Sequence, residues 1–169
     1  MMLAELNRLD EDGFVAAIGP VYEESPWIAR VAAGLRPFAS VQALYVATVN
    51  VLREAGEERQ TALISAHPDL AGRLAREGRL TPASQNEQAS AGLDLLTPEE
   101  RAQFDALNHV YRGRFGFPFV ICAREQTKAS ILRAMKRRVR HSRSEEIETA
   151  LHEIEAIALL RLRDLVSED

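Results

Sequence analysis

Apolar residues alternate with polar ones in short blocks along the chain, and Pro, Gly, Ser, Thr and Asp separate the blocks. Several blocks begin with residues that favour helix starts. These are Asp10, Ser25 before Pro26, Ser40, and Thr97 before Pro98. Ser84 and Thr97 also stand three residues before a glutamate, which is the spacing of a capping box. The pattern predicts an all-α chain.

The blocks predict helices of different lengths. The expected stretches run from Asp10 to Ile18, from Pro26, from Ser40 past Leu52, from Glu57 toward His67, between Asp69 and Gly78, from Ser84, from Thr97 to about Arg114, from near Thr127 and from near Ser144. Residues 116–122 interrupt this pattern, because Pro118 biases Phe117 toward extended geometry and the run is β-rich. This segment has no obvious strand partner. We expect it to cross the core as irregular backbone.

The last predicted helix places one arginine on its apolar face. At about 100° per residue, that face contains Ile147, Ala150, Leu151, Ile154, Ile157, Ala158, Leu162 and Leu165. Arg161 falls on the same face, and Arg163 falls on the opposite side. A guanidinium directed at a core is costly unless an anion meets it. Arg161 is therefore either part of a structural ion pair, an edge residue with its charge in water, or an anion-binding residue in a pocket.

The composition limits the class of protein. The chain has 169 residues, of which 46% are hydrophobic and 27% charged, so we expect one globular domain over residues 1–169. A net charge of -4 gives no reason to expect nucleic acid or a membrane as partner. The single cysteine excludes an internal disulfide. With no signal peptide and no bilayer-spanning apolar run, the expected location is the cytoplasm.

His67 is the first candidate for chemistry. Pro68 pushes it out of helical geometry at a junction between two predicted helices. An imidazole that titrates near neutral pH suits acid–base catalysis, although a capping or surface role is the commoner one. The other histidines have no metal spacing, and Ala156 stands where a second zinc ligand would follow His152. No metal site is expected.

A second candidate is the polar run from Ser84 to Gln88. A helix cap explains Ser84 and Glu87, but five polar residues in succession exceed what a cap requires. A helix N-terminus also binds anionic or carbonyl oxygens, so both interpretations hold together. The basic run 136–143 is interpreted as a solvated helix face balanced by the glutamates that follow, rather than as a nucleic-acid site. Cys122 lies in an apolar run and is expected to be inert packing.

Three segments in this order, together with the ending from Glu153 to Leu162, carry a resemblance to one family. They are Ala66-His67-Pro68-Asp69-Leu70-Ala71-Gly72, Ser84-Gln85-Asn86-Glu87-Gln88, and Tyr111-Arg112 through Phe115-Gly116-Phe117-Pro118-Phe119-Val120-Ile121-Cys122. Over nearly its whole length the chain resembles the 2-oxo-4-hydroxy-4-carboxy-5-ureidoimidazoline (OHCU) decarboxylases. Each motif alone is weak, and their order and intervals make the resemblance specific.

The resemblance implies a helical, usually dimeric enzyme without metal or organic cofactor, acting on a small-molecule substrate, OHCU. It implies that His67 is the catalytic acid–base residue, with Glu87 beside it. It also implies a substrate pocket lined by Pro68, Ser84, Gln85, Asn86, Gln88, the backbone of Phe119, Val120, Ile121, Cys122 and Ala123, and the cationic Arg161. The expected reaction is decarboxylation of OHCU to (S)-allantoin in urate degradation.

Two other functions remain open at this point. One is a different enzyme of ureide metabolism, such as a hydrolase or racemase of allantoin, which would release no CO2. The other is a helical interaction module without catalysis, with the basic run and the acidic last helix as its partner surfaces.

Overall fold

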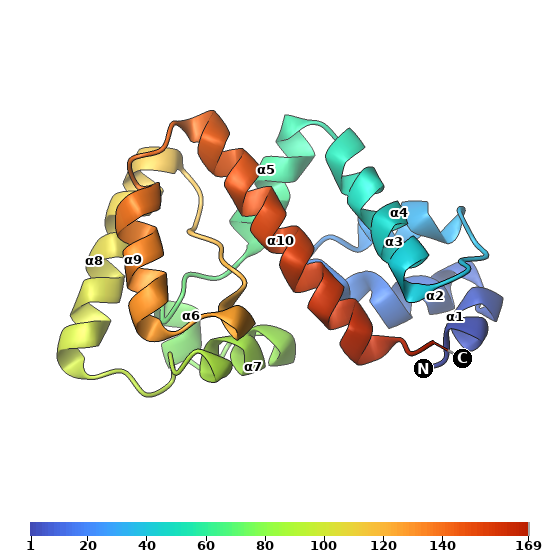
Figure 1. The fold of residues 1–169 in the computed structure, drawn as a ribbon, viewed down its shortest axis with the longest axis horizontal. Helices are drawn as coiled ribbons and strands as arrows, with labels where there is room; N and C mark the ends of the chain where they lie inside the picture. Colours follow the sequence, from blue (N-terminus) through green and yellow to red (C-terminus); the bar gives the residue numbers. More distant parts are fainter. Residues whose placement is uncertain (169) are drawn as a thin grey trace. The chain divides into compact units, whose positions relative to one another are not determined.

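The computed structural model describes residues 1–168, which contain helices and no strand. The all-α prediction is confirmed. In chain order the helices are α1 (Leu3–Arg8), α2 (Glu11–Ile18), η1 (Gly19–Val21), α3 (Pro26–Ala33), α4 (Val41–Glu54), α5 (Glu57–Ala66), α6 (Arg73–Arg76), α7 (Pro82–Ser90), α8 (Pro98–Phe115), η2 (Ala123–Glu125), α9 (Lys128–Arg138) and α10 (Arg143–Leu165) (Figure 1). Within residues 1–168, no helix is both long enough and apolar enough to cross a bilayer.

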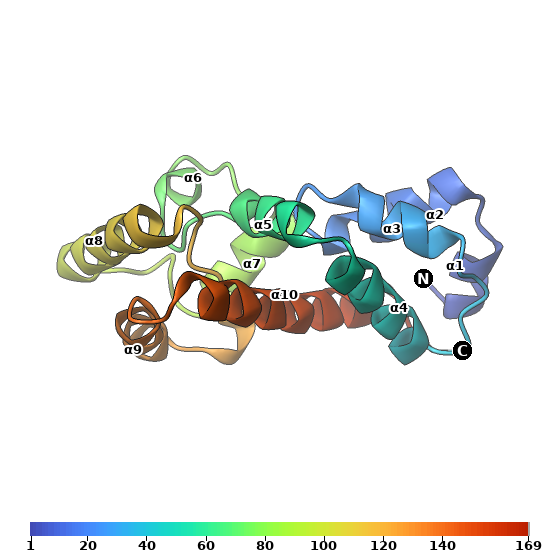
Figure 2. The ribbon, with the colours of Figure 1, turned by 90° about the horizontal axis from the view of Figure 1, so that it is seen from above.

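The chain divides into two compact units. The first contains Met1–Ala66 and the chain from Glu155 onward, and the second contains His67–Ile154. In the first unit α3 packs against both α2 and α4 (Figure 2). Phe14, Ile28 and Leu44 are fully buried there. In the second unit α8 packs against α9. Helix α10 begins in the second unit and ends in the first.

Local capping chemistry explains most of the helix starts. Asp10 accepts a hydrogen bond from the Gly13 N–H at 2.8 Å, and Ser40 accepts one from the Ala43 N–H at 3.0 Å. Thr97 and Glu100 form the predicted capping box at the start of α8, with reciprocal bonds of 3.1 and 3.0 Å. These bonds confirm the predicted helix starts. Such starts can be predicted from sequence because a cap depends on residues only three apart.

The start of α7 differs from the prediction. The helix begins at Pro82, and its N-cap is Thr81, whose hydroxyl accepts from the Ser84 N–H at 3.3 Å. Ser84 therefore lies in the first turn and is not the cap, so that prediction was wrong. The physical reason is that Thr81 followed by Pro82 is a stronger start, since Pro is pre-organised for the first helical position.

The predicted non-helical segment is confirmed. Gly116 ends α8 in the left-handed region (φ +80°), and its N–H bonds to the Arg112 carbonyl at 2.8 Å. Residues 117–122 then run without regular structure until η2 begins (Figure 1). The rings of Phe117 and Phe119 pack edge-on against Tyr111 of α8, with centroids 6.2 and 5.3 Å apart.

The apolar face of α10 is largely as predicted. Arg161 is buried, and so are the apolar residues that share its face, whereas Arg163 is exposed. Leu165 is the exception, because 40% of its surface is accessible. It is the last residue of the helix, where the buried face has ended.

Candidate active site

The loop between α5 and α6 carries His67. Helix α5 ends at Ala66, and the imidazole-bearing residue that follows is 93% buried, since its exposed fraction is 7%. Pro68 is half-buried. The carboxylate of Asp69 accepts hydrogen bonds from Arg112 Nε at 2.8 and 3.0 Å. The junction thus places a buried histidine next to a loop that Arg112 holds.

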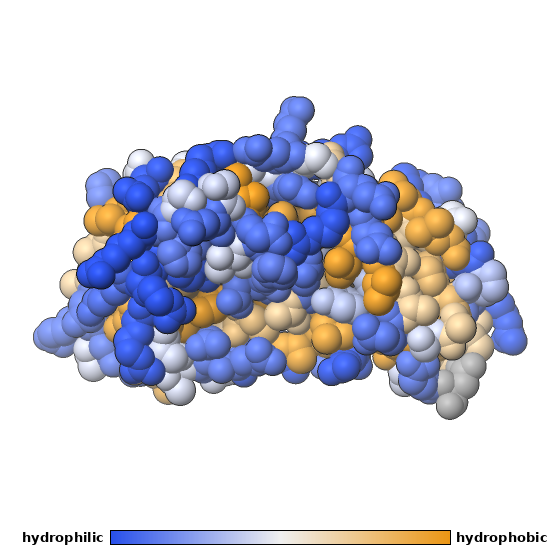
Figure 3. Space-filling view, turned by 45° about the horizontal axis from the view of Figure 1, so that its top comes forward, coloured by the Kyte–Doolittle hydropathy of each residue, from blue (hydrophilic) through white to orange (hydrophobic). Residues whose placement is uncertain are grey.

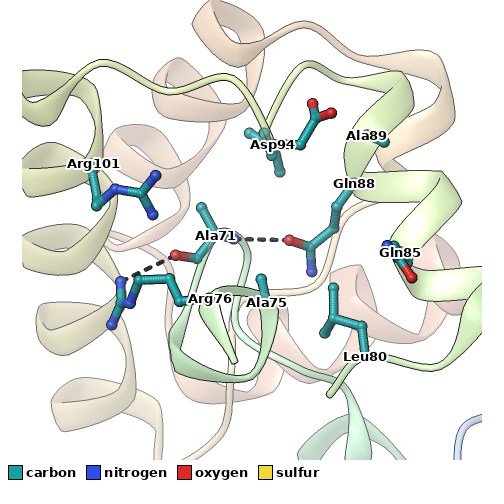
Figure 4. A pocket seen from close by; sticks show the side chains of 10 residues that line it. Ala71, Ala75, Arg76, Leu80, Gln85, Gln88, Ala89, Asp94 and Arg101 are labelled. Carbon is teal, nitrogen blue, oxygen red and sulfur yellow. Dashed lines mark hydrogen bonds between the residues drawn. The ribbon is translucent and has the colours of Figure 1, made fainter. Parts of the chain in front are cut away.

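Two further side chains hold this loop from α7 and α8. The Gln88 side chain accepts from the Ala71 N–H at 2.9 Å (Figure 4). Its amide nitrogen lies 3.5 Å from the Asp69 carbonyl. Asn108 donates to the Leu70 carbonyl at 2.9 Å. Gln88, one of the expected substrate residues, is therefore also a structural partner of the His67 loop.

Helix α7 presents its polar run unevenly. Ser84 and Gln88 are buried one turn apart, Glu87 is half-buried, and Gln85 and Asn86 are exposed. The helix packs against η2, which directly follows the extended segment. Glu87 is close enough to Cys122 that its charge contributes to raising the pKa of that thiol. The second unit therefore brings Glu87 close to the extended segment, while Asn86 lies on the outer side of the helix.

In the extended segment, some backbone groups are hydrogen-bonded to side chains of other helices and others are unpaired within the described residues. The Val120 carbonyl accepts from Arg138 Nη1 at 2.8 Å, and the Cys122 N–H donates to Glu153 Oε2 at 2.8 Å. Phe119 and Ile121 are buried, yet within residues 1–168 their backbone N–H and C=O groups have no hydrogen-bond partner. Successive residues of an extended chain direct these groups to alternate sides. Buried unpaired backbone groups are rare, and they suit a polar ligand.

Cys122 is unsuited to act as a nucleophile. Burial, reinforced by the carboxylates of Glu125, Glu153 and Glu87, raises the pKa of its thiol to about 11. The reactive form of a cysteine is the thiolate, which is scarce at neutral pH under these conditions. The thiol therefore behaves as packing, in agreement with its interpretation from sequence.

Arg161 lies in the first unit and is paired there. Its Nη2 is 3.1 Å from Glu23 Oε1, and its Nη1 donates to the Val21 carbonyl at 3.2 Å. Both side chains of the ion pair are buried. The structural ion pair that the sequence left open is therefore present, and the anion-binding role of Arg161 remains a proposal.

The sequence interpretation missed a second buried ion pair. Arg138 is 2% exposed, and its Nε lies 2.6 Å from Oε1 of the fully buried Glu146. The expectation of a solvated basic face holds for Lys136, Arg137 and Arg140, but it was wrong for Arg138. The α9 part of the surface is accordingly hydrophilic (Figure 3). The signal was available, because Arg138 follows Ile131, Ala134 and Met135 at helical spacing.

A cavity of about 410 Å³ lies within the second unit. Its walls include Ala71, Arg76, Gln85, Gln88 and Arg101 (Figure 4). Its volume is in the range of small-ligand sites. Of the expected site residues it brings together Gln85 and Gln88, whereas His67, Ser84 and Glu87 are not among its lining residues.

Comparisons with known proteins identify the family. The model of the OHCU decarboxylase family matches residues 7–163. The chain belongs to the OHCU decarboxylase family. It is 46% identical over 169 residues to an OHCU decarboxylase of Haloferax volcanii, covering 100% of this chain and 98% of that one. It is 44% identical over 165 residues to one of Halalkalicoccus jeotgali, covering 98% and 92% of the two chains.

An animal relative agrees with this placement, and two solved structures share the fold. The OHCU decarboxylase of Mus musculus is 38% identical over 169 residues, which is 98% of this chain and 93% of that one. A crystal structure of (S)-allantoin synthase superposes with a TM-score of 0.79 and 25% identity, covering 98% of this chain and 54% of that chain. A crystal structure of OHCU decarboxylase in the presence of (S)-allantoin shares the fold, with a TM-score of 0.71, 23% identity, and coverage of 93% and 98%.

Proposed function

We propose that this member of the OHCU decarboxylase family decarboxylates OHCU to (S)-allantoin in urate degradation, without a metal or an organic cofactor. The observation that carries the proposal is the family match over residues 7–163, which includes parts of both compact units. The two units then act as one domain over residues 1–169. The relatives at 44% and 46% identity bear the name of this activity.

The reaction needs an acceptor for the electron pair released with CO2. Many decarboxylases use a cofactor for this purpose. In OHCU the ring C=N bond lies next to the carbon that loses its carboxylate. When the C–C bond to the carboxylate breaks, its electron pair forms a C=C bond between the two ring carbons, and the former C=N π pair moves to the ring nitrogen, which takes up a proton from solvent. The hydroxyl then loses its proton to become a carbonyl, and the neighbouring carbon gains a proton and becomes the stereocentre.

We assign His67 to the proton of the hydroxyl group. Its burial at the end of α5 and the anchored loop that follows it support this assignment. Glu87 orients the imidazole or accepts hydrogen bonds from the ureido N–H groups of the substrate. General acid–base catalysis of this kind contributes about 10²–10⁴ in rate. A proton delivered to one face of the ring intermediate gives the (S) configuration.

Arg161 and the extended segment stabilise the charge that develops. A tight hold on the departing carboxylate would oppose its loss, since catalysis requires preferential binding of the transition state. Arg161 therefore binds a ring or ureido oxygen that gains charge. The unpaired backbone groups of Phe119 and Ile121 supply donors and acceptors for the ureido-imidazoline. The remaining binding residues are Pro68, Ser84, Gln85, Asn86, Gln88, Val120, Cys122 and Ala123.

A measurement of CO2 separates this function from its alternatives. Substrate would be made in situ from urate with urate oxidase and hydroxyisourate hydrolase, and the release of CO2 followed with and without the protein. Acceleration of CO2 release supports the decarboxylase. A protein that processes allantoin without accelerating CO2 release would be another ureide enzyme, and one without effect on either would be an interaction module.

A further inference from the structure

We propose that Arg112 and Asn108 of α8 are positioning residues for His67, acting through the loop that follows it. The inference rests on the proposed role of His67, but its test includes a measurement that does not depend on activity. Both side chains reach the loop directly, Arg112 at the Asp69 carboxylate and Asn108 at the Leu70 carbonyl.

The loop depends on side chains for its path. Pro68 has no N–H and disfavours helical geometry at His67, so α5 cannot continue through this point. One internal backbone bond is present, from the Gly72 N–H to the Asp69 carbonyl at 3.2 Å. Among residues 1–168, the other hydrogen bonds to Asp69, Leu70 and Ala71 come from side chains of other helices.

The backbone of Ala71 is in an unfavourable conformation that the rest of the structure imposes on the loop. Its φ is +52°, in the left-handed region that residues other than Gly adopt at a cost. The Gln88 side chain holds its N–H at 2.9 Å, and Arg76 donates to its carbonyl at 3.3 Å (Figure 4). Such a conformation persists only where the surroundings impose it, so the clamping side chains determine where the loop runs.

Helix α8 connects this loop to the extended segment. Asn108 and Arg112 are four residues apart and share one face of the helix. Tyr111 of the same helix packs against Phe117 and Phe119. One capped helix of 18 residues therefore holds both the loop that carries His67 and the segment with unpaired backbone groups. We infer that α8 sets the spacing between these two parts of the site.

Loss of the Arg112 side chain should displace His67 more than it lowers the free energy of unfolding. The side chains of Arg112 and Asp69 are 44% and 27% exposed, and exposed ion pairs stabilise a fold only weakly. A misplacement of about 1 Å at a reacting group, in contrast, costs on the order of 100-fold in rate. Loss of either the Arg112 or the Asn108 contact should therefore lower kcat by about 10- to 100-fold and change KM by less than about threefold.

The test is the imidazole spectrum of the full-length protein. The chain has four histidines, so the ¹H–¹³C signals of their Cε1 groups are few, and His67→Ala assigns the signal of His67. Arg112→Ala and Asn108→Ala should shift or split this signal and lower kcat. Arg114→Ala is the matched control, because Arg114 lies on the same helix and donates to the His141 carbonyl instead. It should leave the His67 signal and kcat unchanged.

Arg112→Lys separates positioning from a general loss of folding. An ammonium still pairs with Asp69, so this variant should restore most of kcat and return the His67 signal toward its wild-type position. A His67 signal that stays in place in both alanine variants overturns the proposal, whatever the activity. A displaced signal with wild-type kcat also overturns it. If the wild type is inactive but the His67 signal is displaced in the alanine variants, the decarboxylase function is contradicted and the positioning contact is not.

Discussion

Arg138 and Arg161 are buried arginines whose carboxylate partners lie in other helices or loops. Arg138 meets Glu146 across the α9–α10 turn, and Arg161 meets Glu23 from the other end of the chain. The periodicity of α10 predicts that Arg161 faces the core, because that pattern is local to one helix. Neither partner could be predicted, since each depends on tertiary packing. The same limit applies to Arg112, which lies 43 positions from Asp69.

Removal of one partner of the buried Arg138–Glu146 pair should strongly destabilise the second unit. Glu146→Ala leaves a guanidinium buried without its counter-ion, which costs about 3–5 kcal/mol in free energy of unfolding. Urea denaturation followed by circular dichroism measures this loss. Glu148→Ala is the control, since its pair with His152 is exposed and its removal should cost less than about 1 kcal/mol. Equal losses in both variants would contradict the structural role of the buried pair.

Local rules predict the helices well where one signal dominates. Asp10, Ser40 and Thr97 cap helices as expected, because the bonds form within one turn. Ser84 was misplaced because Thr81 offers a competing cap at the same spacing. The extended segment was predicted from Pro118 and its β-rich neighbours. Its two unpaired residues, Phe119 and Ile121, could not be, since they depend on which carbonyls and amides the neighbouring helices engage.

The capping box of α8 should make stability depend on pH. A hydrogen bond from Lys128, and then one from the Thr97 N–H, lower the pKa of Glu100 below its ordinary 4.5. A carboxylate with a lowered folded-state pKa stabilises the fold above its unfolded value, and this contribution is lost as pH falls through the folded value. Glu100→Gln should therefore lower the Tm at pH 7 but much less at pH 3. Glu99→Gln is the control, and a Tm difference independent of pH would contradict the account.

At the scale of the whole molecule, the proposed site residues are divided between the two compact units. His67, Glu87 and the extended segment belong to the second unit, and Arg161 belongs to the first. The family match includes parts of both, and it supports our proposal that residues 1–169 act as one functional domain. The pattern of apolar and polar residues predicted the fold class, and the ordered motifs carried the resemblance to the family. They could not predict how the chain divides, because α10 runs from one unit into the other.

We also propose a homodimer, as the resemblance implies. Light scattering coupled to size-exclusion chromatography should give twice the 18.8 kDa mass of the chain. Measurement over a range of concentrations distinguishes a stable dimer from weak association. A mass of one chain at all concentrations would contradict the dimer without affecting the proposed chemistry.

We propose above that the protein decarboxylates its substrate stereospecifically, with His67 as the acid–base residue. The most direct measurement is the circular dichroism of allantoin formed from urate through urate oxidase and hydroxyisourate hydrolase, with wild type, His67→Ala or no added protein. We expect rapid formation of an (S) signal with wild type, and a fall of at least about 100-fold in its rate with a folded His67→Ala variant. Slow, racemic allantoin with wild type would contradict the decarboxylase, and a rapid (S) signal with His67→Ala would contradict the role of His67.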